Sequence, residues 1–276
     1  MAGMQTRSLT RWSSYALCIA LLATIMVFSS TSARAAWSQF RGPNRNGKTD
    51  ETGLMDEWPD GGPEQLWMNE DIGFGFSSAS VTDDMIYTTG LEDKKGYIYA
   101  INMDGELEWK KSYGKGWTGA HPGTRTTPTV DDGKLYIMSG HGVAACFDAE
   151  DGEEIWSVDT MEKFGAPQVT WGITESPLVM EDKVIFTPGG DKAGMVALNP
   201  DTGATIWVCK GINDKTGYCS PIAVERGGKT IIAQLLATTF VGVNAENGDL
   251  LWRVERDPTP KYKIQAVSPV YDDGMF

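Results

Sequence analysis

The sequence predicts an all-β chain built from repeated four-stranded units, and three observations carry this prediction. Trp recurs at intervals of about 46 residues, and a Gly precedes it at a fixed distance. A hairpin-like phrase stands about 30 residues ahead of each Trp, and no helical periodicity follows residue 36. Four-stranded units of about 40–50 residues are the signature of a β-propeller blade.

The clearest part of the repeat is a turn that ends in Trp. Its four Gly–Trp pairs are Gly105–Trp109, Gly152–Trp156, Gly203–Trp207 and Gly248–Trp252. An Asn or Asp opens each turn, and its side chain can hydrogen-bond the backbone ahead while Gly supplies a positive φ. Because a large ring at a fixed place in every blade can pack against the neighbouring blade, we expect these Trp and Gly residues to dock.

The hairpin phrase begins with a hydroxyl residue, in most units followed by Pro. It reads Thr127-Pro128, Ser176-Pro177 and Ser220-Pro221, and Ser78 starts a version without Pro. A short apolar run, a polar turn and a second β-branched or aromatic run follow, which together predict the first hairpin of a blade.

The first 35 residues are typical of a secretory signal. Arg7 and Arg11 precede an uncharged apolar run, residues 15–28, and small residues end in Ala33-Arg34-Ala35. The alternative is a transmembrane anchor, but the run is shorter than the roughly 20 residues that span a bilayer. We therefore predict cleavage after Ala35, no transmembrane anchor after cleavage, and a periplasmic or secreted protein.

Charge and composition exclude several functions. The net charge of −13, from 24 basic and 37 acidic residues, disfavours nucleic acid as a partner. His121 and His141 have no zinc-site spacing, and no metal site is expected. Beyond the signal, Cys146, Cys209 and Cys219 allow at most one disulfide, so either Cys209 and Cys219 pair or both are buried thiols.

The segments ahead of two hairpin phrases carry larger side chains than the others. Trp117, His121 and Arg125 precede one first strand, and Gln168, Trp171 and Glu175 precede the next. Residues at these places lie on the rim of a propeller channel, where loops collect function. We expect a ligand- or partner-binding site there; the alternative is an Arg125–Glu175 ion pair with Trp rings that close the loops.

The phrase from Ala197-Leu198-Asn199 to Trp207 resembles the tryptophan-docking repeat of pyrroloquinoline quinone (PQQ)-like, quinoprotein alcohol dehydrogenase-like propellers. The opening Trp37-Ser38-Gln39-Phe40-Arg41-Gly42-Pro43, with Gly47, resembles the start of secreted PQQ-like repeat proteins of planctomycete-type bacteria. Further matching phrases are residues 124–128, residues 171–177 and Pro188-Gly189-Gly190. The resemblance covers residues 37–276.

The resemblance implies two kinds of function. Enzymes of the family bind PQQ and Ca²⁺ and often carry a vicinal disulfide, but this sequence has no adjacent cysteines and no recognisable calcium set. The other branch includes the propeller scaffold of the outer-membrane barrel-assembly machinery, a relative of this family, which binds proteins. The expectation is a non-enzymatic scaffold for a protein or polymer, with no cofactor and no catalytic residue. The alternatives are a PQQ- and Ca-dependent alcohol or sugar dehydrogenase, and a carbohydrate-binding propeller.

The resemblance also bears on domain organisation. Residues 1–35 are the signal peptide, 36–66 an N-terminal lead-in and 67–276 an incomplete propeller. About four complete blades and the start of a fifth, residues 268–276, are expected. Because family rings usually have seven or eight blades, the sequence predicts a fragment of such a ring.

Overall fold

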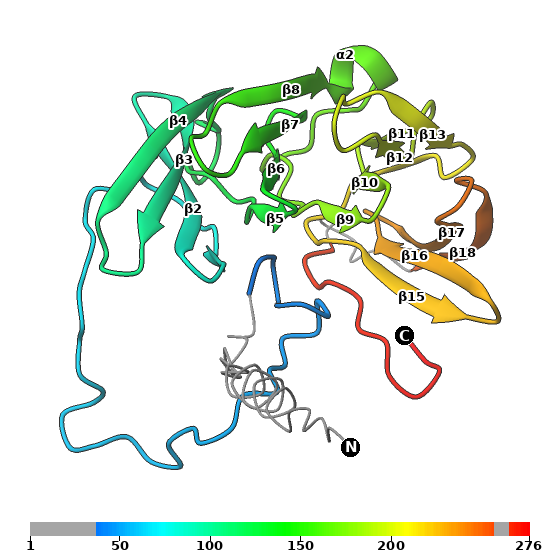
Figure 1. The fold of residues 1–276 in the computed structure, drawn as a ribbon. Coiled ribbons are helices and arrows are strands. Elements are labelled where there is room, and N and C mark those ends of the chain that lie inside the picture. The colour runs from blue at the N-terminus through cyan, green and yellow to red at the C-terminus, as the bar shows by residue number, and fades with distance from the viewer. Residues whose placement is uncertain (1–36, 257–264) are drawn as a thin grey trace, which may run out of the picture. The chain divides into compact units, whose positions relative to one another are not determined.

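The computed structural model describes residues 37–256 and 265–276, which fall within one compact unit. The predicted signal peptide and its cleavage site lie outside the described residues. Four four-stranded antiparallel sheets follow one another along the chain, here called blades 1 to 4 (Figure 1). This architecture confirms the predicted all-β class.

Each blade is a meander in which sequential strands pair as neighbours. Blade 1 contains β1 (Ser80–Val81), β2 (Met85–Glu92), β3 (Lys95–Asn102) and β4 (Leu107–Lys115). Blade 2 contains β5 (Thr129–Asp131), β6 (Lys134–Met138), β7 (Val143–Asp148) and β8 (Glu154–Asp159). Blade 3 contains β9 (Leu178–Met180), β10 (Lys183–Phe186), β12 (Met195–Leu198) and β13 (Thr205–Cys209). Blade 4 contains β15 (Ile222–Arg226), β16 (Lys229–Leu235), β17 (Thr239–Asn244) and β18 (Leu250–Glu255).

Two small elements depart from the meander. β11 (Gly189–Gly190) pairs with β14 (Asp214–Lys215) in a separate two-stranded sheet. The five-residue helix α2 (Thr160–Phe164) follows β8, where the sequence shows no helical period. Asp159 caps its N-terminus and Gly165, at φ 70°, ends it. Within the described part of the chain, no helix has the length and apolarity that a bilayer crossing requires.

The predicted turn forms as the residue types require. Asn199 Oδ1 accepts hydrogen bonds from the backbone N–H groups of Asp201 and Thr202, both at 3.0 Å. Gly203 closes the turn at φ 65° and donates to the Asn199 carbonyl. Asn102, Asp148 and Asn244 open the equivalent turns in the same way.

Four of the repeat Trp residues pack on the turn Gly of the blade that follows them. A Cβ on Gly203 would lie 2.8 Å from the Trp156 ring, and Trp156 Nε1 donates to Pro200 O at 2.8 Å. The same contact joins Trp67 to Gly105, Trp109 to Gly152 and Trp207 to Gly248. Trp252 instead packs against Phe240, with ring centroids 4.9 Å apart. Only Gly leaves room for the ring at this place.

The cores lie between neighbouring blades. One buried cluster joins blades 1 and 2, a second joins blades 2 and 3, and a third joins blades 3 and 4. In β12, Val196 and Leu198 face blade 2, whereas Met195 and Ala197 face blade 4. A middle strand buried on both faces needs apolar residues at every position, as in β12.

A chain of hydroxyl hydrogen bonds links the starts of the blades. The backbone N–H of Ser78 donates to Thr127 Oγ1 at 3.1 Å, and that of Thr127 donates to Ser176 Oγ at 3.1 Å. Ser176 N–H donates to Ser220 Oγ at 2.9 Å, and Ser220 N–H to Ser268 Oγ at 3.1 Å. The hydroxyl residue of each hairpin phrase therefore staples its blade to the preceding one.

The first part of the lead-in, residues 37–47, is here called the N-terminal strap. Its Trp37 and Ser38 carbonyls accept from Val81 N at 2.9 Å and Val130 N at 2.8 Å. Farther along, Arg45 binds backbone carbonyls that precede β9. The strap thus contacts blades 1, 2 and 3 in turn. Gly42 is required there because a Cβ would lie 2.6 Å from the Trp37 ring.

Candidate functional site

The predicted rim residues lie where two loops meet. Phe76, His121, Arg125 and Trp171 line a cavity of about 340 Å³, here called the mouth cavity. Phe76 and His121 are exposed, and Arg125 and Trp171 are half-buried. The structure therefore brings three of the six sequence-predicted residues together and adds Phe76.

Arg125 is held by its own loop. Nη1 donates to Gly123 O at 2.7 Å, and Nη2 donates to the His121 carbonyl. Its guanidinium carbon lies 5.4 Å from the Phe76 ring centroid and 6.0 Å from that of Trp117. Burial lowers the pKa of Arg125 from its usual value, yet an arginine keeps its proton at neutral pH. The site presents a fixed positive charge between aromatic faces.

Trp117 and Gln168 support the loops and do not line the mouth cavity. Trp117 is buried, and its Nε1 donates to Ala120 O at 3.2 Å. Gln168 Nε2 donates to Gly140 O at 3.3 Å. A Cβ on Gly172 would lie 2.9 Å from the Trp117 ring, so the loop before β9 rests on that ring.

Glu175 does not form the ion pair with Arg125 that the sequence suggested as an alternative. It is fully buried, and its Oε1 accepts from Thr187 N at 2.8 Å, while Oε2 has no hydrogen-bond partner. Burial raises the pKa of Glu175 to about 7, against the opposing effects of the Thr187 hydrogen bond and the charge of Arg45. The charge of Arg45 that acts on its pKa comes from a residue of the N-terminal strap.

Arg45 is buried with its guanidinium against blade 3. Nη2 donates to Ser176 O at 2.7 Å, and Nη1 donates to Pro177 O and Gln39 Oε1, both at 2.9 Å. Burial lowers the pKa of Arg45 to about 10, and Glu175 opposes that shift. The hydrogen bonds from Arg45 to Ser176 O and Pro177 O fix the strap to the residues just before β9.

A second cavity, of about 290 Å³ and here called the inner cavity, lies next to the mouth. Arg125 and Phe76 belong to both linings. The inner cavity is lined at the position two residues before each stapling hydroxyl. These positions are Phe76, Arg125, Thr174, Tyr218 and Ala266. The residue type at this position changes from one repeat to the next, whereas the hydroxyl residues that also line the cavity recur.

Phe76 and Tyr218 are two aromatic cavity residues that sequence reasoning missed. Each stands two residues before a hydroxyl residue of the repeat, Ser78 and Ser220, as Arg125 stands before Thr127. Since successive side chains of an extended segment point to opposite sides, this offset was a usable signal. Glu175 stands one residue before Ser176 and is on the buried side.

The three described cysteines are buried free thiols. Cys209 and Cys219 could form a disulfide or remain buried thiols, and in the structure they remain buried thiols. Burial raises the pKa of Cys209 to about 11 and that of Cys219 to about 12, so neither is a reactive thiolate at neutral pH.

The comparisons with known proteins agree with this architecture. A protein-family model described as "Outer membrane protein assembly factor BamB" matches residues 94–266. Quinoprotein alcohol dehydrogenase PedH of Pseudomonas putida is 28% identical over 136 residues, which are 47% of this chain and 22% of that protein. Outer membrane protein assembly factor BamB of Salmonella typhimurium is 29% identical over 106 residues, 37% of this chain and 25% of the relative.

Among solved structures, the quinohemoprotein alcohol dehydrogenase of Comamonas testosteroni matches with a TM-score of 0.54 and 18% identity, covering 68% of this chain and 36% of that one. The corresponding enzyme ADHIIG of Pseudomonas putida HK5 matches with a TM-score of 0.51 and 22% identity, covering 69% and 35%. These likenesses show a shared fold. The chain spans about a quarter or less of each of these curated relatives.

The resemblance to PQQ-dependent enzymes implies a calcium site. Calcium takes about six to eight oxygen ligands, carboxylates among them. Neither the mouth nor the inner cavity has an Asp or Glu in its lining, and residues 37–256 and 265–276 hold no metal-competent group of three or more His, Cys, Asp and Glu. The linings of these two cavities therefore do not fit calcium.

Proposed function

We propose, because the chain belongs to the protein family described as outer membrane protein assembly factor BamB, that it is a non-enzymatic scaffold that holds a protein or polymer partner. We place it in the periplasm or outside the cell. The partner contacts the mouth cavity, where Phe76, His121, Arg125 and Trp171 are the contact residues.

One observation carries the proposal. The mouth combines exposed aromatic surface with a single fixed guanidinium and has no carboxylate in its lining. Aromatic residues and Arg are the side chains that dominate binding energy at protein interfaces. General acid–base or metal-assisted chemistry needs paired titratable groups or a ligand set, which this lining does not supply.

A site-specific cross-link tests the proposal. We replace His121 with a photo-reactive residue in the full chain, and an exposed residue of the far hairpin, Lys229, in a matched control. Cross-linking in periplasmic extract should give a discrete adduct from position 121 that is absent from position 229 and lost on adding Arg125→Ala. Equal adducts from both positions would contradict a partner site at the mouth.

The second candidate is a PQQ- and Ca-dependent alcohol or sugar dehydrogenase, which the 28% identity to a quinoprotein alcohol dehydrogenase favours. Purified protein mixed with PQQ and Ca²⁺ should reduce an acceptor dye with alcohols or sugars if this candidate is right. The scaffold proposal expects no cofactor-dependent reduction above a protein-free control.

A further inference from the structure

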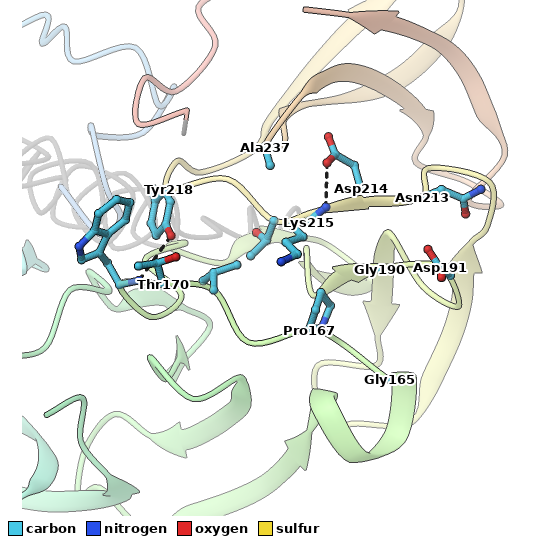
Figure 2. Close-up of a pocket in the computed structure, with 13 residues that line it drawn as sticks. Gly165, Pro167, Thr170, Gly190, Asp191, Asn213, Asp214, Lys215, Tyr218 and Ala237 are labelled. Carbon is cyan, nitrogen blue, oxygen red and sulfur yellow. Dashed lines mark hydrogen bonds between the residues drawn. The ribbon is translucent and has the colours of Figure 1, made fainter. Parts of the chain in front are cut away.

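A cleft of about 620 Å³ lies beside the mouth cavity, and Trp171 belongs to both linings. It is here called the rim cleft, and Figure 2 shows its lining residues. They come from the loop between α2 and β9, from β11 and β14 with the residues that flank these two strands, and from the turn after β16. The volume is within the range of about 300–1,000 Å³ that small-ligand sites occupy.

Glycines shape one wall of the cleft. Gly189 and Gly190 form β11, with φ of 74° and 106°, and pair with Lys215 and Asp214 of β14. A Cβ on Gly189 would lie 2.4 Å from Thr216 N, so the two strands can approach only without a side chain there. This close approach explains the two glycines of the phrase Pro188-Gly189-Gly190, which does not line the mouth cavity.

An aromatic pair forms another wall. Trp171 and Tyr218 are both half-buried, with ring centroids 5.5 Å apart in an edge-to-face arrangement. Tyr218 Oη accepts from Trp171 N at 3.4 Å. The pair is a fixed aromatic surface beside an open space.

Polar side chains stand opposite the aromatic pair. In Figure 2, Tyr218 is at one side of the cleft, Asn213 and Asp191 are at the other, and Lys215 lies between them. Asp191, Asn213 and Lys215 are exposed. These three side chains supply hydrogen-bond donors and acceptors to the cleft.

Asp214 has a structural role and is not counted among the binding groups. Its Oδ1 accepts from Lys215 N at 2.9 Å. Its Oδ2 accepts from Thr238 N at 2.7 Å, Thr238 Oγ1 at 3.0 Å and Thr239 Oγ1 at 2.9 Å. Four accepted hydrogen bonds occupy this carboxylate and tie β14 to blade 4.

This chemistry selects among ligands. One lysine beside one exposed carboxylate gives no excess of positive charge, and the chain carries −13, so phosphate-rich ligands are disfavoured. A lipid tail would need a lining free of exposed charges. A sugar ring has an apolar face that packs on an aromatic ring and hydroxyls that take both donors and acceptors.

We propose that the rim cleft binds an uncharged glycan chain. One sugar ring packs on the Trp171–Tyr218 pair, and hydroxyls of the chain bind Asp191, Asn213 and Lys215. The inference deepens the proposed function, because it rests on non-catalytic binding at this rim and names the class of polymer.

Calorimetric titration of the full chain tests it, with cellohexaose, chitohexaose, maltohexaose and mannohexaose as probes. At least one hexasaccharide should bind. Trp171→Ala should weaken that binding roughly tenfold or more, and Asp191→Ala roughly 3- to 10-fold, with unchanged unfolding midpoints. The matched controls Trp58→Ala and Asp83→Ala change exposed residues outside the cleft and should bind as wild type.

Two results would overturn the inference. One is that none of the four hexasaccharides binds at millimolar concentration. The other is that binding survives Trp171→Ala and Asp191→Ala unchanged. Either result leaves the His121 cross-link as the separate test of the scaffold, and cofactor-dependent dye reduction would refute the scaffold without bearing on the titration.

Discussion

Arg45 Nη2 lies 2.7 Å from the carbonyl oxygen of Ser176, although 131 positions separate the two residues. The contact closes a chain of hydrogen bonds from the N-terminal strap to blades 1, 2 and 3. The Arg45 side chain is buried. Burial lowers the pKa of Arg45 and raises that of Glu175, and the attraction between their opposite charges opposes both shifts. The strap therefore ties blades 1, 2 and 3 together through its backbone and the buried Arg45.

Arg45→Ala should lower the free energy of unfolding by about 3 kcal/mol, because the buried Ser176 carbonyl loses its hydrogen bond from Arg45 and the buried Glu175 loses the positive charge that acts on it. Urea unfolding followed by Trp fluorescence measures the loss. Lys48→Ala, an exposed change just beyond the strap, serves as the control. A loss below about 0.5 kcal/mol for Arg45→Ala would show that the strap does not anchor the blades.

Glu175→Gln should reduce the pH dependence of stability. The folded pKa of about 7 lies above the ordinary 4.5, so the folded state binds more protons than the unfolded state between these values. Wild-type stability should then fall as pH rises from about 4.5 to 7, by roughly 1–3 kcal/mol. Gln keeps the acceptor for Thr187 N and does not titrate.

Unfolding free energies at pH 5 and pH 8 check this sign. The variant should lose less stability than wild type between the two pH values. An identical decrease in both proteins would assign the pH dependence to another group.

Gly203→Ala should destabilise the protein by about 1–3 kcal/mol more than Gly228→Ala. Both glycines have a positive φ, 65° and 73°, so the backbone penalty is shared. Only at Gly203 does a Cβ meet the Trp156 ring, at 2.8 Å, while Gly228 has nothing within 4 Å. Equal losses of unfolding free energy would mean that Trp docking adds nothing beyond the turn conformation.

Thr127→Val should cost about 1 kcal/mol, because the isosteric side chain removes the acceptor for Ser78 N. Thr127→Ser retains an Oγ and should cost much less. Ser157→Ala, on the exposed face of β8, is the control. Chemical unfolding of the three variants measures their losses of unfolding free energy. Equal losses for Thr127→Val and Thr127→Ser would show that the hydrogen bond from Ser78 N to Thr127 Oγ1 does not stabilise the fold.

Much of the fold follows from the sequence because the repeat has local causes. The turn from Asn199 to Gly203 needs an Asx acceptor and a positive φ, and only Gly leaves room for Trp156. These requirements recur in every blade, so four-stranded units and docking Trp residues are predictable. The total number of blades and the signal peptide stay predictions.

The site is less predictable because its contacts join distant parts of the chain. Arg125 could be predicted because it is larger than the residues at equivalent places in other units. Phe76 and Tyr218 could be recognised only by their position two residues before a hydroxyl residue, and the structure shows what that hydroxyl residue does. Glu175 was assigned to the rim, yet the alternation of an extended segment turns it inward. Arg45, whose positive charge acts on the pKa of Glu175, is 130 positions away in the sequence, so no local pattern predicts this relationship.

The central claim is that a partner binds at the mouth through the outward-facing positions. The most direct measurement is the His121 photo-adduct yield in three backgrounds: wild type, Arg125→Ala and Glu175→Gln. Arg125→Ala should abolish the adduct at an unchanged unfolding midpoint, whereas Glu175→Gln should leave it at the wild-type level. An adduct that survives Arg125→Ala, or that depends on Glu175 instead, would contradict the account.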